Sequence, residues 1–199
     1  ATMIPLREDH LSTPWEMFRT LYLYWIYSRS RNLRYRLVPA ASKLMGHIES
    51  WQERSGAWLR HVAPHPQRPA KKKEDAVLTA LAIQFFVRYG DMAEHQQSIE
   101  KAKRWLLTNA SPSGGWRNPV ITDAESDILA TVVALDALRR VGAPADHPAI
   151  QEAEGALNRW QHPTGYWEIK KSLGEFPTVI AIEYLRSRSA RGTLPNAFL

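Results

Sequence analysis

The stretches Trp51-Gln52-Glu53-Arg54-Ser55-Gly56-Ala57-Trp58 and Trp160-Gln161-His162-Pro163-Thr164-Gly165-Tyr166-Trp167 share the pattern W-Q-x-x-x-G-x-W without a gap. Between them, Ser111-Pro112-Ser113-Gly114-Gly115-Trp116 repeats the second half of the pattern, with Ala110 at the glutamine position. Three copies in one chain indicate an internal repeat with a period of roughly 50 residues, so a repeat architecture has to be considered first.

The residues before each motif predict an amphipathic helix. Apolar residues recur there with a spacing of four, which places them on one buried stripe. Counted back from the closing tryptophan, the equivalent residues are Ile48, Leu106 and Leu157, and four residues earlier Leu44, Ala102 and Ala153.

The residues after each motif predict a second helix that is apolar on most of its circumference. These helices follow a loop and align from Thr79, Thr131 and Thr178 onward. Asp75 and Asp127 lie four residues before the first two threonines, where a carboxylate favours a helix start. Gly90 and Gly142 are expected to end these two helices.

The whole pattern predicts an all-α fold, a partial α/α toroid of about three and a half helical hairpins. The apolar helices form its inner layer and the amphipathic helices its outer layer. Helices are expected near residues 13–28, 34–51, 74–89, 95–109, 124–141, 147–160 and 175–188. Strand signals are weak, and Lys71-Lys72-Lys73 is assigned to a proline-rich loop. The expected organisation is an N-terminal aromatic helix and linker (1–35), three repeats (36–189) and a C-terminal tail (190–199).

The motifs resemble the QW-type repeat of terpenoid cyclases and protein prenyltransferases, which ends in Q-x(2-5)-G-x-W. The first and third copies match it fully and the second in part, and the resemblance covers about residues 36–189. It implies that the closing tryptophans cover helix ends, and that each glycine permits the tight turn beneath. A closed toroid of this family has about six hairpins, so these repeats are expected to form an arc.

The resemblance also implies where catalytic residues would lie. Proton-donating cyclases carry D-x-D-D-T at the start of an inner helix, and their acid must stay protonated. In Asp127-Ile128-Leu129-Ala130-Thr131 and in Asp75-Ala76-Val77-Leu78-Thr79, only the first aspartate and the threonine match. Asp127, Asp75, Asp123 and Glu125 are therefore weak catalytic candidates, and helix capping is the alternative role.

Cofactor chemistry is not expected. The protein prenyltransferases that these motifs resemble bind zinc through an Asp-x-Cys motif. In this chain, Leu129 and Val77 occupy the positions of that cysteine. The chain has no cysteine, which excludes disulfides and thiolate nucleophiles, and its seven histidines show no metal-binding spacing. We expect neither a metal nor another cofactor.

Ligand contact is expected on the inner helices, where a bound isoprenoid would meet aromatic side chains. Core packing is the alternative role for these residues. The candidates are Phe85, Phe86 and Tyr184, together with the threonines Thr79, Thr131 and Thr178.

Charge and hydropathy argue against two classes of function, nucleic-acid binding and membrane insertion. The net charge is +6, but Lys and Arg are scattered without aromatic interleaving, so nucleic acid is not the expected partner. The sequence contains no apolar run of about 18 residues, which is the length that would indicate a membrane span. These features, with the absence of cysteine, fit a cytoplasmic protein.

The leading hypothesis is a cyclase-like repeat domain without independent catalysis that binds an apolar, isoprenoid-like ligand or a protein partner. The alternative is a terpenoid cyclase, or a fragment of one, acting on an isoprenoid substrate. Residues 13–28 carry Trp15, Phe18, Tyr22 and Trp25, which are expected either to form a homodimer or partner contact or to pack on the repeats.

Overall fold

The computed structural model describes residues 14–27, 31–62, 71–118, 126–167 and 176–189. Within these ranges the chain forms helices and one short hairpin, and the predicted helical repeat is confirmed. The elements are α1 (Pro14–Tyr27), α2 (Arg31–Ser50), β1 (Leu59–Val62), β2 (Lys71–Glu74), α3 (Ala76–Tyr89), α4 (Gln96–Thr108), α5 (Ile128–Arg140), α6 (Pro148–Trp160) and α7 (Phe176–Ser189).

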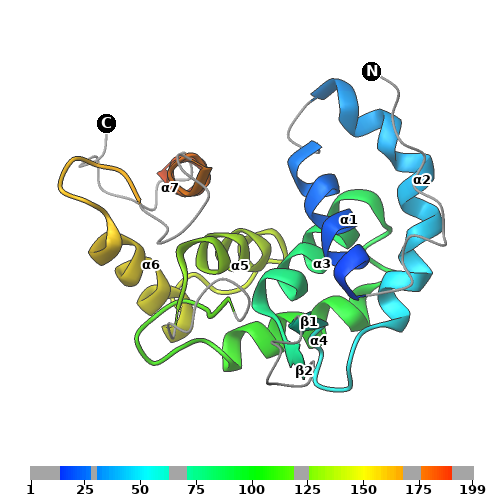
Figure 1. Cartoon of the computed structure of the whole chain (residues 1–199), viewed down its shortest axis with the longest axis horizontal. Helices are drawn as coiled ribbons and strands as arrows, with labels where there is room; N and C mark the ends of the chain where they lie inside the picture. The colour runs from blue at the N-terminus through cyan, green and yellow to red at the C-terminus, as the bar shows by residue number, and fades with distance from the viewer. Residues whose placement is uncertain (1–13, 28–30, 63–70, 119–125, 168–175, 190–199) are drawn as a thin grey trace.

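The helices form an inner and an outer layer. In the inner layer α1 packs on α3, α3 on α5 and α5 on α7. The outer helices α2, α4 and α6 lie around this layer, as Figure 1 shows. The inner helices α3 and α5 are buried along nearly their whole length, whereas α4 and α6 bury one face each. This difference follows from the residue pattern, because only the inner helices lack a continuous polar face.

The helix ends follow from local capping. Asp75 and Asp127 are the N-cap residues of α3 and α5, and each accepts a hydrogen bond from a backbone N–H three residues on. The helix expected from residue 124 therefore begins at Ile128. At the other end of α5, Gly142 has φ 69°, the left-handed conformation that commonly follows a helix.

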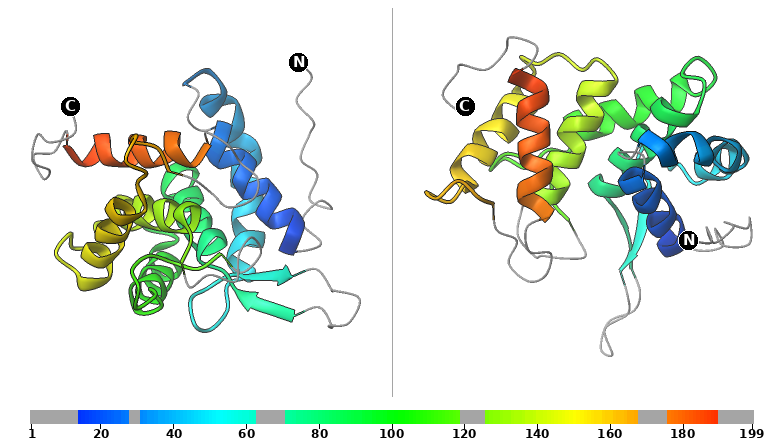
Figure 2. Two further views of the ribbon diagram at one scale, coloured as in Figure 1. Left: turned by 60° about the vertical axis from the view of Figure 1, so that its left-hand side comes forward. Right: turned by 90° about the horizontal axis from the view of Figure 1, so that it is seen from above.

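The assignment of Lys71-Lys72-Lys73 to a loop is wrong. These lysines lie in β2, which pairs antiparallel with β1 from Leu59 opposite Glu74 to Val62 opposite Lys71. The hairpin continues the turn of the first motif, since the Asp75 N–H donates to the Trp58 carbonyl. It projects from the helical layers in Figure 2. Two strands of four residues, one of them mainly lysine, carry too little apolar alternation to be detected.

The N-terminal helix α1 is part of the hydrophobic core. Met17, Leu21, Tyr24 and Trp25 are buried, and the helix lies against α3. This is the second of the two arrangements expected for residues 13–28. The side chains of Trp15 and Phe18 lie outside the described part of the chain, and the domain division at residue 35 stays a prediction.

Candidate functional site

The closing tryptophans hold the three motifs in equivalent positions. Trp58, Trp116 and Trp167 are 0%, 0% and 2% exposed. Each indole Nε1 donates to the carbonyl of the residue ten positions earlier, at 2.7, 2.9 and 2.8 Å. Those carbonyls belong to the end of the preceding outer helix, where backbone oxygens have no partner within the helix. The tryptophans are therefore structural residues, as the repeat predicted.

The first two threonines of the inner helices also support these motifs. The Thr79 and Thr131 hydroxyls accept hydrogen bonds from the backbone N–H groups of Trp58 and Trp116, each at 3.1 Å. Both threonines are 0% exposed. They therefore have a structural role, and their predicted ligand contact stays a prediction. The side chain of Thr178 lies outside the described residues.

The two candidate acids lie at the N-terminal ends of neighbouring inner helices. Asp75 is 0% and Asp127 8% exposed. One carboxylate oxygen of each caps its helix, at 2.8 Å from the Leu78 N–H and 2.9 Å from the Ala130 N–H. The capping role is thus observed for both. Asp123 and Glu125 lie outside the described residues.

Burial shifts the proton equilibrium of Asp127. Loss of water around the carboxyl raises its pKa, and the nearby charge of Asp75 acts in the same direction. Hydrogen bonds from the backbone of the first helical turn and from the Asn118 side chain oppose this shift without cancelling it. The protonated form is consequently favoured more than in a solvent-exposed aspartate. A proton donor needs this property, but one oxygen of the same carboxyl already accepts the capping hydrogen bond of α5.

A shallow aromatic depression lies at the opposite end of the inner layer. Its cavity volume is about 10 Å³. The lining residues come from the C-terminal half of α1, from the middle and the end of α3 and from the end of α5. They are Leu21, Tyr24, Trp25, Leu81, Gln84, Phe85, Arg88, Tyr89 and Arg140.

Three aromatic rings form one wall of this depression. Tyr24 meets Phe85 and Tyr89 edge-on, with ring centroids 5.1 and 5.3 Å apart, and Phe85 lies 5.3 Å from Tyr89. Such contacts between π-systems hold the rings in fixed orientations. The Tyr24 hydroxyl is buried and has no hydrogen-bond partner among the described residues. Burial, and secondarily the nearby Tyr89, raise the pKa of Tyr24 to about 12.

One polar residue of the depression links α3 to α5, and another is paired within α5. The Gln84 amide donates to the Val133 carbonyl at 3.1 Å. Arg140 donates from Nε to Asp136 at 2.8 Å, so its positive charge is already paired. Arg139 binds the same carboxylate at 2.6 Å. The two arginines hold the pKa of Asp136 below its ordinary value although burial acts against them.

Of the three predicted aromatic ligand residues, only Phe85 lines the depression. Phe86 lies deeper, between Trp58 and His95, with ring centroids 6.1 and 4.7 Å away. Tyr184 is on α7, where its hydroxyl donates to Glu154 on α6 at 2.7 Å. Burial raises the pKa of Tyr184 as well. The structure therefore separates these three residues.

The acidic residues do not line the depression. Asp75 and Asp127 are absent from its wall. Along α3, the nearest lining residue to Asp75 is Leu81, about 9 Å of helix away, and the farthest is Tyr89, about 20 Å away. No carboxyl group of the described residues therefore lines the aromatic depression.

Most of the residues that line the depression were not predicted as ligand contacts. Arg88 and Arg140 could have been found, since each lies nine residues after the threonine of its inner helix. Tyr24 has no such sequence signal, and Trp25 was predicted only to pack on the repeats or on a partner, because the contribution of both depends on how α1 packs against α3.

No group of three or more His, Asp or Glu side chains in the described residues is arranged to hold a metal ion. In the same part of the chain, no helix combines the length and the apolar character that crossing a bilayer requires.

Comparisons with known proteins agree with this architecture. Residues 73–161 match the squalene-hopene cyclase N-terminal domain family. No curated protein matches the sequence. The type II terpene cyclase MstE from Scytonema, in its apo form, superimposes with a TM-score of 0.53 and 21% identity, over 75% of this chain and 52% of that one.

A variant of MstE in complex with its substrate geranylgeranyl dihydroxybenzoate gives a TM-score of 0.57 at 18% identity, over 96% of this chain and 60% of that one. The chain thus spans between half and two thirds of the enzymes it matches. The resemblance inferred from the motifs is confirmed: residues 73–161 match the squalene-hopene cyclase N-terminal domain, and the chain has the helical fold of type II terpene cyclases.

Proposed function

We propose that this terpene-cyclase-like domain binds one end of an apolar, isoprenoid-like ligand in the aromatic depression between α1 and α3, and that it does not catalyse cyclisation alone. The observation that carries the proposal is the Tyr24 hydroxyl, buried at the depression without a partner among the described residues. A buried polar group of this kind is rare unless another molecule satisfies it. A polar group of the ligand or an ordered water can do so.

The size of the depression limits what it holds. Its cavity volume is about 10 Å³, room for about one water molecule and far below the usual range of ligand pockets. A chain-like ligand would therefore lie across the depression and touch its wall with one end only. Its aromatic and leucine surface suits the branched hydrocarbon of an isoprenoid. The MstE structure in complex with geranylgeranyl dihydroxybenzoate, which has a similar fold, supports this choice of ligand class.

The positions of the acids support the proposed lack of independent catalysis. Asp75 and Asp127 cap α3 and α5, and neither lines the depression. The segments after them lack the further aspartates that the cyclase motif requires. The rival assignment, a complete cyclase, would require a donor from outside the described residues.

Equilibrium dialysis with labelled geranylgeraniol tests the proposal. We expect saturable binding by the wild type and at least tenfold weaker binding by Phe85→Leu. Phe86→Leu is the matched control, because this neighbour is equally buried but packs against Trp58 and His95. The proposal fails if the folded wild type shows no saturable binding. It also fails if the two variants lose affinity equally while remaining folded.

A further inference from the structure

The third motif has the same backbone as the first two but different surroundings. Gly56, Gly114 and Gly165 have φ values of 99°, 89° and 92°. A Cβ on Gly56 would collide with the Lys101 carbonyl in α4, and one on Gly114 with the Glu152 carbonyl in α6. Around Gly165, no heavy atom of the described chain lies within 4 Å of such a Cβ. The first two turns are each packed against the next outer helix, whereas no outer helix of the described residues packs against the third turn.

The two occupied interfaces use equivalent helix positions. Lys101 and Glu152 each lie 15 residues before the closing tryptophan of their own repeat, and Lys43 has this position in α2. Four residues further on, the equivalent residues are Trp105, Ala156 and His47. Trp105 and Ala156 are buried, whereas His47 and Lys43 are exposed. The face of α2 that corresponds to the covered faces of α4 and α6 is therefore uncovered at these two residues.

The motif glutamine shows the same difference. Gln52 donates to the Gly56 carbonyl within its turn and to the Ser98 carbonyl in α4, at 2.9 and 2.8 Å. Gln161 makes the equivalent bond within its turn, to Gly165 at 3.1 Å. The described chain places no outer helix beside Gln161 to provide the second acceptor.

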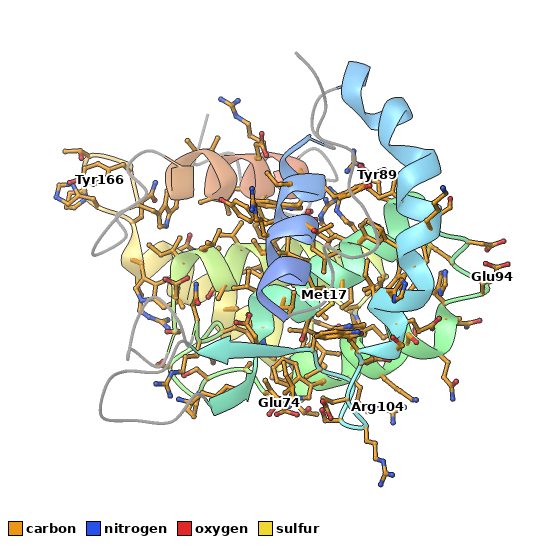
Figure 3. All side chains as sticks on the ribbon, turned by 45° about the vertical axis from the view of Figure 1, so that its right-hand side comes forward. Met17, Glu74, Tyr89, Glu94, Arg104 and Tyr166 are labelled. Carbon is orange, nitrogen blue, oxygen red and sulfur yellow. The ribbon has the colours of Figure 1, made fainter. Side chains whose placement is uncertain are left out.

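Tyr166 adds apolar surface to the third turn. It is 40% exposed and stacks on His162 with centroids 4.5 Å apart. The equivalent residues Ala57 and Gly115 are buried. Figure 3 shows Tyr166 projecting at the edge of the molecule, away from the other labelled side chains. Removing this ring from water would favour association.

We propose that the turn Gln161–Trp167 docks onto the exposed face of α2 in a second copy of this chain. Both halves of the interface are present in one molecule, and two internal examples show that equivalent turns pack on equivalent helix faces. The carbonyl of Ala40, which occupies the position of Ser98, then accepts the second hydrogen bond of Gln161. Because the two surfaces differ, the association is head-to-tail and continues to further copies or closes into a ring.

Site-specific cross-linking through introduced cysteines tests the direction of association. Because the chain has no natural cysteine, only the introduced residues can react. Thr164→Cys and His47→Cys are both substitutions at exposed positions. A short bis-maleimide should link the two variants when they are mixed, and neither variant alone. Cross-links between identical variants, or none in the mixture at concentrations where the wild type associates, would overturn the proposal. A wild type that stays monomeric at every concentration would overturn it as well.

The glutamine variants separate association from folding. Ala110 occupies the glutamine position of the second motif, whose turn still packs on α6, so the glutamine is not required for the turn to form. In sedimentation equilibrium, Gln161→Ala should weaken self-association about three- to tenfold, as expected for one hydrogen bond. The matched variant Gln52→Ala should lower thermal stability and leave association unchanged. Unaltered association of Gln161→Ala would contradict the proposed contact.

Discussion

Replacement of Trp116 by alanine should destabilise the chain by about 3–5 kcal/mol, the usual cost of removing a core tryptophan. Trp116 is fully buried between the end of α4 and the start of α5, and its indole N–H donates to the Leu106 carbonyl at 2.9 Å. The substitution leaves a cavity and removes the partner of that carbonyl. Such a loss is a large share of the stability of an ordinary domain.

Chemical denaturation followed by circular dichroism measures the change in unfolding free energy. In a thermal scan, the expected decrease in melting temperature for a chain of this length is roughly 6–20 °C. Trp116→Phe separates the two contributions, since it retains most of the ring volume and removes only the N–H donor. Trp160→Ala is the control for a tryptophan that is only partly buried. A Trp116→Ala effect below about 1 kcal/mol would refute the structural role of the closing tryptophan.

Substitutions at three further positions probe the same framework. Thr131→Val keeps the side-chain shape but leaves the buried Trp116 backbone N–H without its acceptor, so we expect a loss of about 1–3 kcal/mol in urea unfolding. Asp127→Ala should cost about 1 kcal/mol as a lost N-cap. Asp127→Asn should cost less at pH 7, because the amide oxygen can still cap the helix and the side chain carries no charge. Burial disfavours the charged carboxylate of Asp127, as its raised pKa shows. A larger loss for Asp127→Asn than for Asp127→Ala in thermal melts would contradict this expectation. Because the pKa of Tyr24 is raised to about 12 from an unfolded value near 10, its contribution to stability is complete below pH 10 and is lost as the pH rises toward 12. The unfolding free energy of Tyr24→Phe should fall less steeply over this window, and an unchanged slope would exclude Tyr24 as the titrating group.

Much of the helical framework could be predicted from the sequence because its determinants are local. Apolar spacing located the helices, and Asp75 and Asp127 lie at the observed starts of α3 and α5. The prediction placed the start of α5 too early because it did not give Asp127 the cap position itself. The β1–β2 hairpin was missed because Lys71–Glu74 lacks apolar residues, and its pairing is directed by the neighbouring turn.

The candidate site was less predictable because it depends on contacts between distant segments. Phe85 and Phe86 are adjacent and chemically identical, yet only Phe85 lines the depression. Which of them does so is decided by α1, whose Tyr24 packs against Phe85. The buried state of Thr79 likewise depends on the turn at Trp58, 21 residues earlier. Sequence spacing identified these positions without identifying their neighbours.

Photoaffinity labelling with a diazirine analogue of geranylgeraniol tests the central claim most directly, since it reports both the binding position and the fate of the ligand. Peptide mapping should place the label within residues 21–25 and 81–89, and unlabelled geranylgeraniol should compete for this site. Mass spectrometry should recover the unlabelled competitor chemically unchanged. Labelling concentrated around Asp75 and Asp127 together with a new cyclised product, or the absence of any label that competitor displaces, would contradict the account.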